Sequence, residues 1–409
     1  MTIFMFMGKL LDSYRLLLGS ETVDRISQIA STLKKAKVVH VNSTKEGGGV
    51  AEILSSLVPL MEDLEIDVEW KVIHGEPIFF QCTKTFHNLM QGQKKAPLPS
   101  AFIQAYKETN KKNAEALQEV LQNADFVFIH DPQPLALISY IPNRKGKWIW
   151  RCHIDLSSPN PPLWQFLKKF AASYEASIFS MKDYIQKLPH PSYVVPPGID
   201  PLSEKNKEME REEIVNIFSQ FKIAMNRPTL LQVSRFDKYK DPIGVIKAFR
   251  LAKKKYPDLQ LILAGGGASD DSEGDEMLKN VYKSAANDPD IYILFLPPNA
   301  HRIINALQRG ATIVIQKSLK EGFGLTVTEA LWKAKPVIGG NTGGIRLQVI
   351  DGQTGFLVNT PQEAAERIDY FLQHLDIAQG YGKRGKQLVK EKFLITRQLT
   401  DYLNILAEL

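Results

Sequence analysis

Short apolar, β-branched runs alternate with longer segments of helical spacing along most of this chain. The run KVVHVNS at residues 37–43 predicts a buried strand, the glycines within residues 46–49 a turn, and VAEILSSLVPLMEDL at residues 50–64 a helix. Further strands are predicted at residues 68–75, 126–132, 147–155, 175–180 and 192–200. Strands and helices that alternate at this rhythm indicate a mostly parallel, doubly wound α/β sheet.

The alternation stops once and then restarts, which predicts two domains in a chain of 409 residues. The segment PLSEKNKEMERE, residues 201–212, is charged, begins with proline and has few apolar residues, so we place the linker there. A second set of strands is predicted at residues 229–234, 260–267, 291–297, 311–316 and 336–340. The pattern alone does not decide to which of the two domains the last helical segment, residues 396–409, belongs. We expect two similar Rossmann-like domains that face each other across a cleft.

Composition and charge exclude several classes of protein. The 51 basic and 45 acidic residues give a net charge of +6 without a long basic run, so nucleic acid is not expected as a partner. The two cysteines, Cys82 and Cys152, form no CxxC pair and indicate neither a disulfide framework nor a zinc cluster. The apolar start MTIFMFM is far shorter than the ~20 residues of a membrane span. We therefore expect a cytoplasmic protein with no membrane partner.

Two glutamates flank a glycine-containing turn in EGFGLTVTE, residues 321–329. The preceding predicted strand places Glu321 in a loop at the carboxyl edge of the sheet, where open α/β folds bind ligands. Gly322 and Gly324 let a ligand approach the backbone, and the N–H groups of residues 323–325 lie at the start of a predicted helix. A carboxylate beside free N–H groups suits a polyhydroxylated ligand. The alternative is a capped surface helix with two solvated glutamates, which this stretch alone slightly favours.

Basic and glycine-rich loops supply candidate phosphate contacts. Arg235 and Lys240 follow a predicted strand directly, and a guanidinium and an ammonium group held on one loop suit a diphosphate. The alternative is a solvated basic turn balanced by Asp237 and Asp241. Glycines at residues 47–49 precede a predicted helix, where backbone amides can hold a phosphate. They do not form GxGxxG, which disfavours a dehydrogenase.

One histidine also follows a predicted strand. His153 lies at the end of KWIWRCHID, with Asp155 two residues later and, by strand alternation, on the same face. A single histidine is more often a half-buried structural residue than a catalytic one.

Together these motifs resemble the retaining GT-B glycosyltransferases of glycosyltransferase family 4. The pattern at residues 321–329 is similar to the E-x7-E motif of that family, and R-F-x3-K at residues 235–240 is similar to its phosphate-binding pair. The glycine loop, VPPGID at residues 195–200 and GNTGGIRLQVIDGQTGFLV also match. Three further stretches, HVNSTKEGGGVAEIL, WRCHIDLSSPNPPLW and VSRFDKYKDPIGVIKAF, resemble the trehalose synthases of the glycosyltransferring type and the related trehalose phosphorylases.

The resemblance implies a role for each matching residue. The implied catalytic residues are His153, near the anomeric carbon, Arg235 and Lys240, at the leaving diphosphate, and Glu321, at the donor sugar. Other residues are implied to bind parts of the two substrates. The amides of Gly322, Phe323, Gly324 and Leu325 would bind the sugar hydroxyls, and Glu329 would bind the ribose. Gly48 and Gly49 would contact the phosphates, Leu296 the base, and His74 and Asp155 the acceptor glucose.

The resemblance also implies a domain plan and a reaction. Residues 1–205, with a C-terminal helix at 394–409 packing back on them, would form the acceptor domain, and residues 206–393 the nucleotide-sugar donor domain. The expected reaction is reversible formation of trehalose from UDP-, ADP- or GDP-glucose and glucose, with retention and by a front-face route. No cofactor is expected, because no DxD-like cluster is present; a role for Mg²⁺ is left open, and so is a homodimer.

Four alternatives remain beside this reaction. A trehalose phosphorylase would place inorganic phosphate where the distal phosphate of a nucleotide lies. Another family 4 glucosyltransferase would differ in its acceptor, because the acceptor loops at residues 75–99 are the most variable. A retaining glycoside hydrolase needs two carboxyl groups roughly 5 Å apart but gives no reason for Arg235 and Lys240. A non-enzymatic nucleotide-sugar sensor would tolerate the loss of His153.

Overall fold

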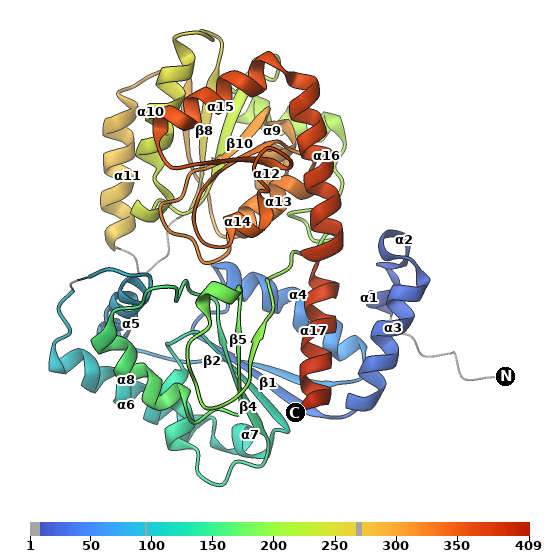
Figure 1. Ribbon diagram of the computed structural model, residues 1–409, viewed down its shortest axis with the longest axis vertical. Coiled ribbons are helices and arrows are strands. Elements are labelled where there is room, and N and C mark those ends of the chain that lie inside the picture. The colour runs from blue at the N-terminus through green and yellow to red at the C-terminus, as the bar shows by residue number, and fades with distance from the viewer. Residues whose placement is uncertain (1–8, 95, 267–271) are drawn as a thin grey trace. The chain divides into compact units, whose positions relative to one another are not determined.

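A computed structural model describes residues 9–94, 96–266 and 272–409 (Figure 1). The chain forms two compact units, Met1–Pro197 with Ile395–Leu409, and Gly198–Leu394. Residues 198–205, which the sequence analysis placed in the first domain, therefore belong to the second unit. Their contacts explain this: Arg302 pairs with Glu204 at 2.8 Å, and the amide of Asn305 donates to the carbonyl oxygen of Glu204 at 3.0 Å.

The first unit is built on a six-stranded parallel sheet in the order β2-β1-β3-β4-β5-β6. Its strands are β1 (Lys37–Asn42), β2 (Asp67–Val72), β3 (Phe126–His130), β4 (Lys147–Cys152), β5 (Ala176–Phe179) and β6 (Ser192–Val194). Each begins within one residue of a run predicted from the sequence, but β2, β3, β4 and β6 end two to six residues before the predicted run does. The strand order reverses between β1 and β3, so the crevice at their carboxyl ends is the place where such sheets bind ligands.

Helices cover both faces of this sheet, with α5, α6 and α8 on one side and α3 and α17 on the other (Figure 1). They are α1 (Lys9–Asp12), α2 (Arg15–Leu18), α3 (Ser20–Ala30), α4 (Gly49–Asp63), α5 (Pro77–Met90), α6 (Ser100–Ala116), α7 (Gln118–Asn123), α8 (Pro161–Ala171) and α17 (Ile395–Glu408). The C-terminal helix α17 contacts α3 and α4, and Tyr402 stacks on Phe128 with ring centroids 5.0 Å apart. The apolar face of α17 thus completes the core of the first unit.

The second unit holds another six-stranded parallel sheet, in the order β12-β11-β10-β7-β8-β9. Its strands are β7 (Thr229–Val233), β8 (Gln260–Gly265), β9 (Ile291–Phe295), β10 (Ile313–Gln316), β11 (Val337–Gly340) and β12 (Gly355–Val358). The sequence predicts five of these strands but not β12. Gly267, at the end of one predicted run, lies outside the described residues. The order reverses between β7 and β10, which defines the expected ligand edge of this sheet.

The helices of the second unit pack on both faces of its sheet. They are α9 (Arg211–Gln220), α10 (Pro242–Lys253), α11 (Ser272–Ala285), α12 (His301–Gly310), α13 (Leu325–Trp332), α14 (Ile345–Gln348), α15 (Pro361–Gln373) and α16 (Leu375–Lys392). Buried aliphatic and aromatic side chains of α10, α15 and the central strands form its core. This rigid core holds the loops that follow β7 and β10.

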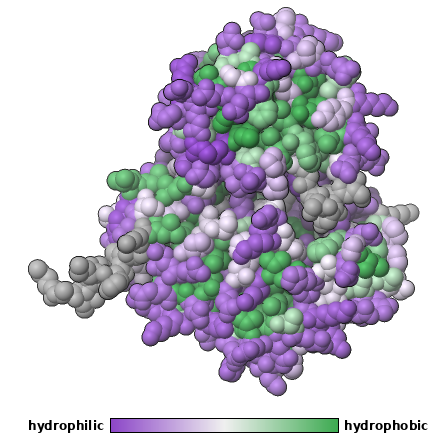
Figure 2. Space-filling view, turned by 180° about the vertical axis from the view of Figure 1, so that it is seen from behind, coloured by the Kyte–Doolittle hydropathy of each residue, from purple (hydrophilic) through white to green (hydrophobic). Residues whose placement is uncertain are grey.

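In the face drawn in Figure 2, hydrophilic side chains cover most of the surface and hydrophobic ones form separate patches. Among the helices that the structure describes, none has the length and apolar character needed to cross a membrane.

Candidate functional site

Lys240 and Glu321 lie in contact at the ligand edge of the second sheet. Lys240 ends a short 3-10 turn (Lys238–Lys240) after β7, and its Nζ lies 2.8 Å from Oε1 and 2.6 Å from Oε2 of Glu321. The hydroxyl of Ser318, just after β10, donates to Glu321 Oε2 at 3.2 Å, and Gln232 donates to the carbonyl oxygen of Lys240 at 2.7 Å. The fold thus brings a cation and a carboxylate from two loops together at the reversal of strand order.

Arg235 extends from the same loop and is more exposed than Lys240. Its side chain is 42% exposed and lies 3.8 Å from the carboxylate of Asp237, which also accepts from the N–H of Tyr239 at 2.7 Å. Asp241 does not face Arg235: it caps α10 by accepting from Gly244 N–H at 3.0 Å and pairs with the buried Lys317. Of the two aspartates in this turn, only Asp237 therefore balances the charge of Arg235, because Asp241 has other partners.

The glycine turn before α13 is held in a fixed conformation. Gly324 adopts a φ of 87°, which L side chains rarely reach, and a Cβ at Gly344 would lie 2.5 Å from Cα of Phe323. The amide of Gln348 donates to the carbonyl oxygen of Phe323 at 2.7 Å. Within the described residues the N–H groups of Phe323, Gly324 and Leu325 have no protein acceptor, so they remain free to donate to a ligand.

Glu329 is completely buried in α13, although the sequence analysis expected it to contact a ribose. Lys205 Nζ lies 3.1 Å from its Oε1, and the amide of Gln308 donates to its Oε2 at 3.2 Å. Burial opposes ionisation, but Lys205 and Lys333 hold the pKa of Glu329 below its ordinary value. Sequence reasoning missed Lys205 because it belongs to the charged segment 201–212, whose composition predicts a solvated linker.

The region expected to hold a base offers an aromatic ring that the sequence analysis missed. The side chain of Leu296 is buried, and its N–H donates to the carbonyl oxygen of Gly265 at 2.8 Å, so Leu296 offers mainly backbone. Phe295, one residue earlier at the end of β9, is 54% exposed and stacks on the buried Phe236, with centroids 6.3 Å apart. An exposed aromatic face at a strand's carboxyl end suits a nucleobase.

In the first unit the glycine loop follows β1 and opens α4. Gly48 has a φ of 93° and precedes Gly49, the first residue of the helix, which therefore begins one residue earlier than predicted. Among the described residues, none accepts a hydrogen bond from the N–H groups of these two glycines. Lys45 lies 3.7 Å from the ring centroid of Trp70 in β2, and Trp70 donates to Asn42 at 2.9 Å. These contacts anchor the loop and leave its amides exposed.

His153 follows β4 and ends a chain of three hydrogen-bonded histidines. His153 Nε2 lies 3.1 Å from His130 Nδ1, and His130 Nε2 lies 3.0 Å from His40 Nδ1. The N–H of His153 donates to Asp131 at 2.7 Å. Burial lowers the pKa of His40 to about 3 and those of His130 and His153 well below their ordinary values, while burial raises the pKa of Asp131 to about 7. The three imidazoles are therefore neutral at pH 7.

The two residues expected at an acceptor sugar differ in exposure. His74 is exposed, and Asn113 fixes its backbone by accepting from its N–H at 2.8 Å and donating to its carbonyl oxygen at 2.7 Å. Asp155 is buried and accepts from Ser157 N–H at 2.9 Å. Because β4 ends at Cys152, strand alternation does not extend to Asp155 and cannot place it beside His153.

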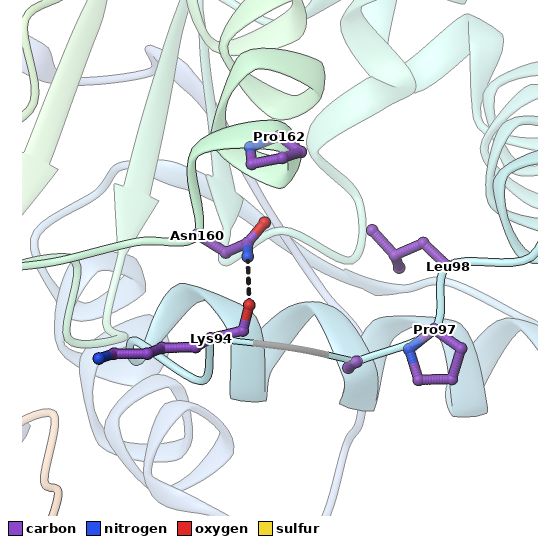
Figure 3. A pocket seen from close by; sticks show the side chains of 6 residues that line it. Lys94, Pro97, Leu98, Asn160 and Pro162 are labelled. Atoms are coloured by element: carbon purple, nitrogen blue, oxygen red, sulfur yellow. Dashed lines mark hydrogen bonds between the residues drawn. The ribbon is translucent and has the colours of Figure 1, made fainter.

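A separate hollow in the first unit lies between the loop after α5 and the start of α8 (Figure 3). It is lined by Lys94, Ala96, Pro97, Leu98, Asn160 and Pro162. Asn160 joins the two segments: its amide donates to the carbonyl oxygen of Lys94 at 3.2 Å, and its oxygen accepts from Leu163 N–H at 3.2 Å. None of the predicted site residues lines this hollow. The described residues also contain no group of three histidines, cysteines or carboxylates arranged to hold a metal ion.

Comparison with known proteins identifies relatives for the whole chain. The profile described as "Trehalose synthase, N-terminal domain" matches residues 40–186, and "Glycosyl transferases group 1" matches residues 213–388. A trehalose synthase of Thermococcus litoralis is 47% identical over 402 residues, which cover 98% of this chain and 97% of that protein. A trehalose phosphorylase of Pleurotus pulmonarius is 29% identical over 401 residues, which cover 85% of this chain and 54% of that protein.

Solved structures agree on the fold. A trehalose-6-phosphate synthase superposes with a TM-score of 0.77 at 14% identity, over 91% of this chain and 99% of that chain. This likeness and the two parallel sheets establish the two-domain GT-B fold. The chain therefore belongs to the trehalose synthase family of glycosyltransferases.

Proposed function

We propose that the protein is a retaining glucosyltransferase that reversibly forms trehalose from a nucleoside-diphosphate glucose and free glucose. One observation supports this above the others: Lys240 Nζ lies within 2.8 Å of both carboxylate oxygens of Glu321 at the ligand edge of the second sheet. A cation for a departing phosphate beside an acceptor for sugar hydroxyls fits a glycosyl phosphate linkage, in which those two groups are adjacent.

The proposed donor contacts divide by chemistry. Arg235 and Lys240 bind the diphosphate, Glu321 accepts from hydroxyls of the glucose, and the free N–H groups before α13 donate to it. As the glycosidic bond breaks, negative charge develops on the phosphate oxygen and is stabilised by cations that are already in place. The acceptor hydroxyl attacks the same face of the sugar and gives its proton to that oxygen, so the configuration is retained.

Phosphorolysis is the second candidate, and the burial of Glu329 favours it. Because Lys205 and Gln308 already contact both oxygens of Glu329, a ribose would reach this carboxylate only after Lys205 moves. Inorganic phosphate has no ribose and needs no such movement. The relationship to the Pleurotus pulmonarius trehalose phosphorylase, at 29% identity, adds weight to the same alternative.

One experiment separates the two reactions. The purified protein is incubated with trehalose and either UDP, ADP, GDP or inorganic phosphate, and the sugars are identified by chromatography. Nucleoside-diphosphate glucose plus glucose supports the synthase, whereas glucose 1-phosphate formed only with phosphate refutes it in favour of the phosphorylase. If trehalose is untouched in every mixture, both reactions are refuted.

Matched variants test the donor site. Lys240→Met should lower kcat of the nucleotide reaction by about 10²-fold, since one preorganised cation is lost from the leaving group. Lys238→Met removes an exposed lysine two residues earlier, which lies 5.2 Å from the ring centroid of Tyr239, and should leave kcat unchanged. Equal kcat values for the two variants would refute the placement of the diphosphate.

A further inference from the structure

We propose that His40 and His130 are positioning residues that fix His153 as its Nδ1–H tautomer, so that His153 serves as a hydrogen-bond donor and not as a base. The inference rests on the proposed function and deepens it, because the family resemblance implies a place for His153 near the anomeric carbon of the transferred sugar. It assigns a task to two buried histidines that contact no substrate themselves.

The geometry forces the two hydrogen bonds to run in the same direction. A neutral imidazole has one N–H and one bare nitrogen, so a neutral His130 donates to one neighbour and accepts from the other. The two N···N distances, 3.0 Å to His40 and 3.1 Å to His153, are both those of hydrogen bonds. The protons therefore point along the chain either towards His153 or towards His40.

The far end of the chain decides between these directions. His40 Nε2 is buried and has no partner among the described residues. If the protons pointed towards His40, this atom would be an N–H donor without an acceptor, which is the rarer kind of buried orphan in proteins. If they point towards His153, His40 Nε2 holds only a bare lone pair. The second direction is therefore favoured.

The near end of the chain is open. His153 is only partly buried, and its Nδ1 makes no hydrogen bond within the described residues. Because Nδ1 is not among the buried atoms without a partner, it is accessible. With the protons directed towards His153, its Nε2 accepts from His130 and its Nδ1 offers an N–H to solvent or ligand. Burial and, to a smaller extent, the charge of the buried Arg151 lower the pKa of both His130 and His153, which keeps the three imidazoles neutral.

Packing keeps the rings aligned. His40 stacks on Phe128 at 4.7 Å and His130 stacks on His153 at 5.4 Å between ring centroids. The N–H of His153 is held by Asp131, and Asp131 N–H donates to the carbonyl oxygen of Arg151 at 2.9 Å. A donor at a sugar hydroxyl or at the departing oxygen is useful only if it is held in one orientation, which these contacts provide.

The tautomer can be measured directly in the full-length protein. Its eight histidines are labelled with ¹⁵N in the ring, and a long-range ¹H–¹⁵N spectrum at pH 7.5 distinguishes the two tautomers; a His153→Asn variant assigns the signal. We expect the Nδ1–H form for His153, and a shift towards the Nε2–H form in His40→Phe, which keeps the stack on Phe128. An Nε2–H form in the unmodified protein, or no change in His40→Phe, would overturn the proposal.

Kinetics provide the second test. His130→Leu removes the donor to His153 and should lower kcat about tenfold with little change in the KM for nucleotide. His130→Asn places an amide N–H near the position of Nδ1 and should restore most of kcat. His190→Gln alters a histidine that contacts Ser177 at 2.7 Å and should have no effect. Loss of activity that asparagine does not rescue would indicate a merely structural role and overturn the proposal.

The two tests separate failure of this inference from failure of the proposed function. If the unmodified protein transfers no glucose, the proposed function fails while the spectrum still decides the tautomer. If transfer is normal and the His153 tautomer is the wrong one, only the inference fails.

Discussion

Replacing Lys205 with methionine should destabilise the second unit by about 3 kcal/mol. The side chains of Lys205 and Glu329 are 12% and 0% exposed, and their charged atoms lie 3.1 Å apart. Removing one partner from a buried ion pair costs about 3–5 kcal/mol, because the other charge stays buried without compensation. The lower value is expected here because Gln308 still donates to Glu329 at 3.2 Å and Lys333 still lies nearby.

Amide hydrogen exchange measures this loss where it should occur. Peptides from α12 and α13 report on the second unit, and peptides from α8 report on the first and serve as an internal reference. Lys207→Met is the matched control: its ammonium group lies 2.5 Å from Glu204, but the two side chains are 40% and 52% exposed, and such pairs contribute little. We expect faster exchange in α12 and α13 for Lys205→Met alone.

A double variant tests the reason for the loss. Lys205→Met with Glu329→Gln removes both charges, so most of the lost protection should return although two side chains have changed. The reasoning would be refuted if Lys205→Met exchanged like Lys207→Met, or if the double variant lost as much as the two single variants combined.

Protonation and backbone geometry give two more predictions. The first unit should unfold more easily as the pH falls below about 6.5, because an unfolded His40 binds a proton that the folded one, with a pKa of about 3, does not. Between pH 7 and pH 5 this lowers the free energy of unfolding by about 2 kcal/mol, at 1.36 kcal/mol per pH unit below 6.5. In thermal unfolding, His40→Phe should therefore lose about 2 kcal/mol less stability over this pH range than the unmodified protein. An equal loss in both proteins would contradict the assignment. Asp131, with its raised pKa of about 7, stabilises the folded state as the pH falls, but it does so in both proteins, so its contribution cancels in the comparison. In the second unit, Gly340→Ala should lower both Tm and activity, since a Cβ there would lie 2.2 Å from the carbonyl oxygen of Ser318. Gly380→Ala in α16 would meet only Arg384 Nη1 at 3.4 Å and should stabilise the helix by about 0.5–1 kcal/mol, so similar Tm shifts would refute the argument.

Most of the fold could be predicted because most of the strands are buried on both faces. Runs such as KVVHVNS and FVFIHDP have no polar alternation, as expected for parallel strands covered by helices on each side, and they fall where β1 and β3 lie. The strand β12 is different: its run, GFLV, starts with glycine, which weakens a strand pattern. A strand of that kind is identified only by its pairing with β11.

The candidate site was predictable only at strand ends. Topology brings the loops after β7 and β10 to one edge, so Lys240 and Glu321 could be assigned to a shared site before any distance was known. Lys205 could not, because a lysine in a charged linker and a lysine buried against Glu329 have the same local composition. His40 and His130 were missed for a related reason. Each lies in an apolar run, and only the pairing of β1 with β3 reveals that their rings meet.

The contact between Lys240 and Glu321 is compatible with the proposed binding of a diphosphate. An ammonium group has three N–H donors, and two contacts with Glu321 leave one for a phosphate oxygen. In the proposed reaction a phosphate oxygen would therefore add to the pair without separating it. In that reaction the carboxylate would orient the cation before the glycosidic bond breaks, so little reorganisation would be needed when negative charge develops on the leaving oxygen. That is the condition under which such charges accelerate a reaction most.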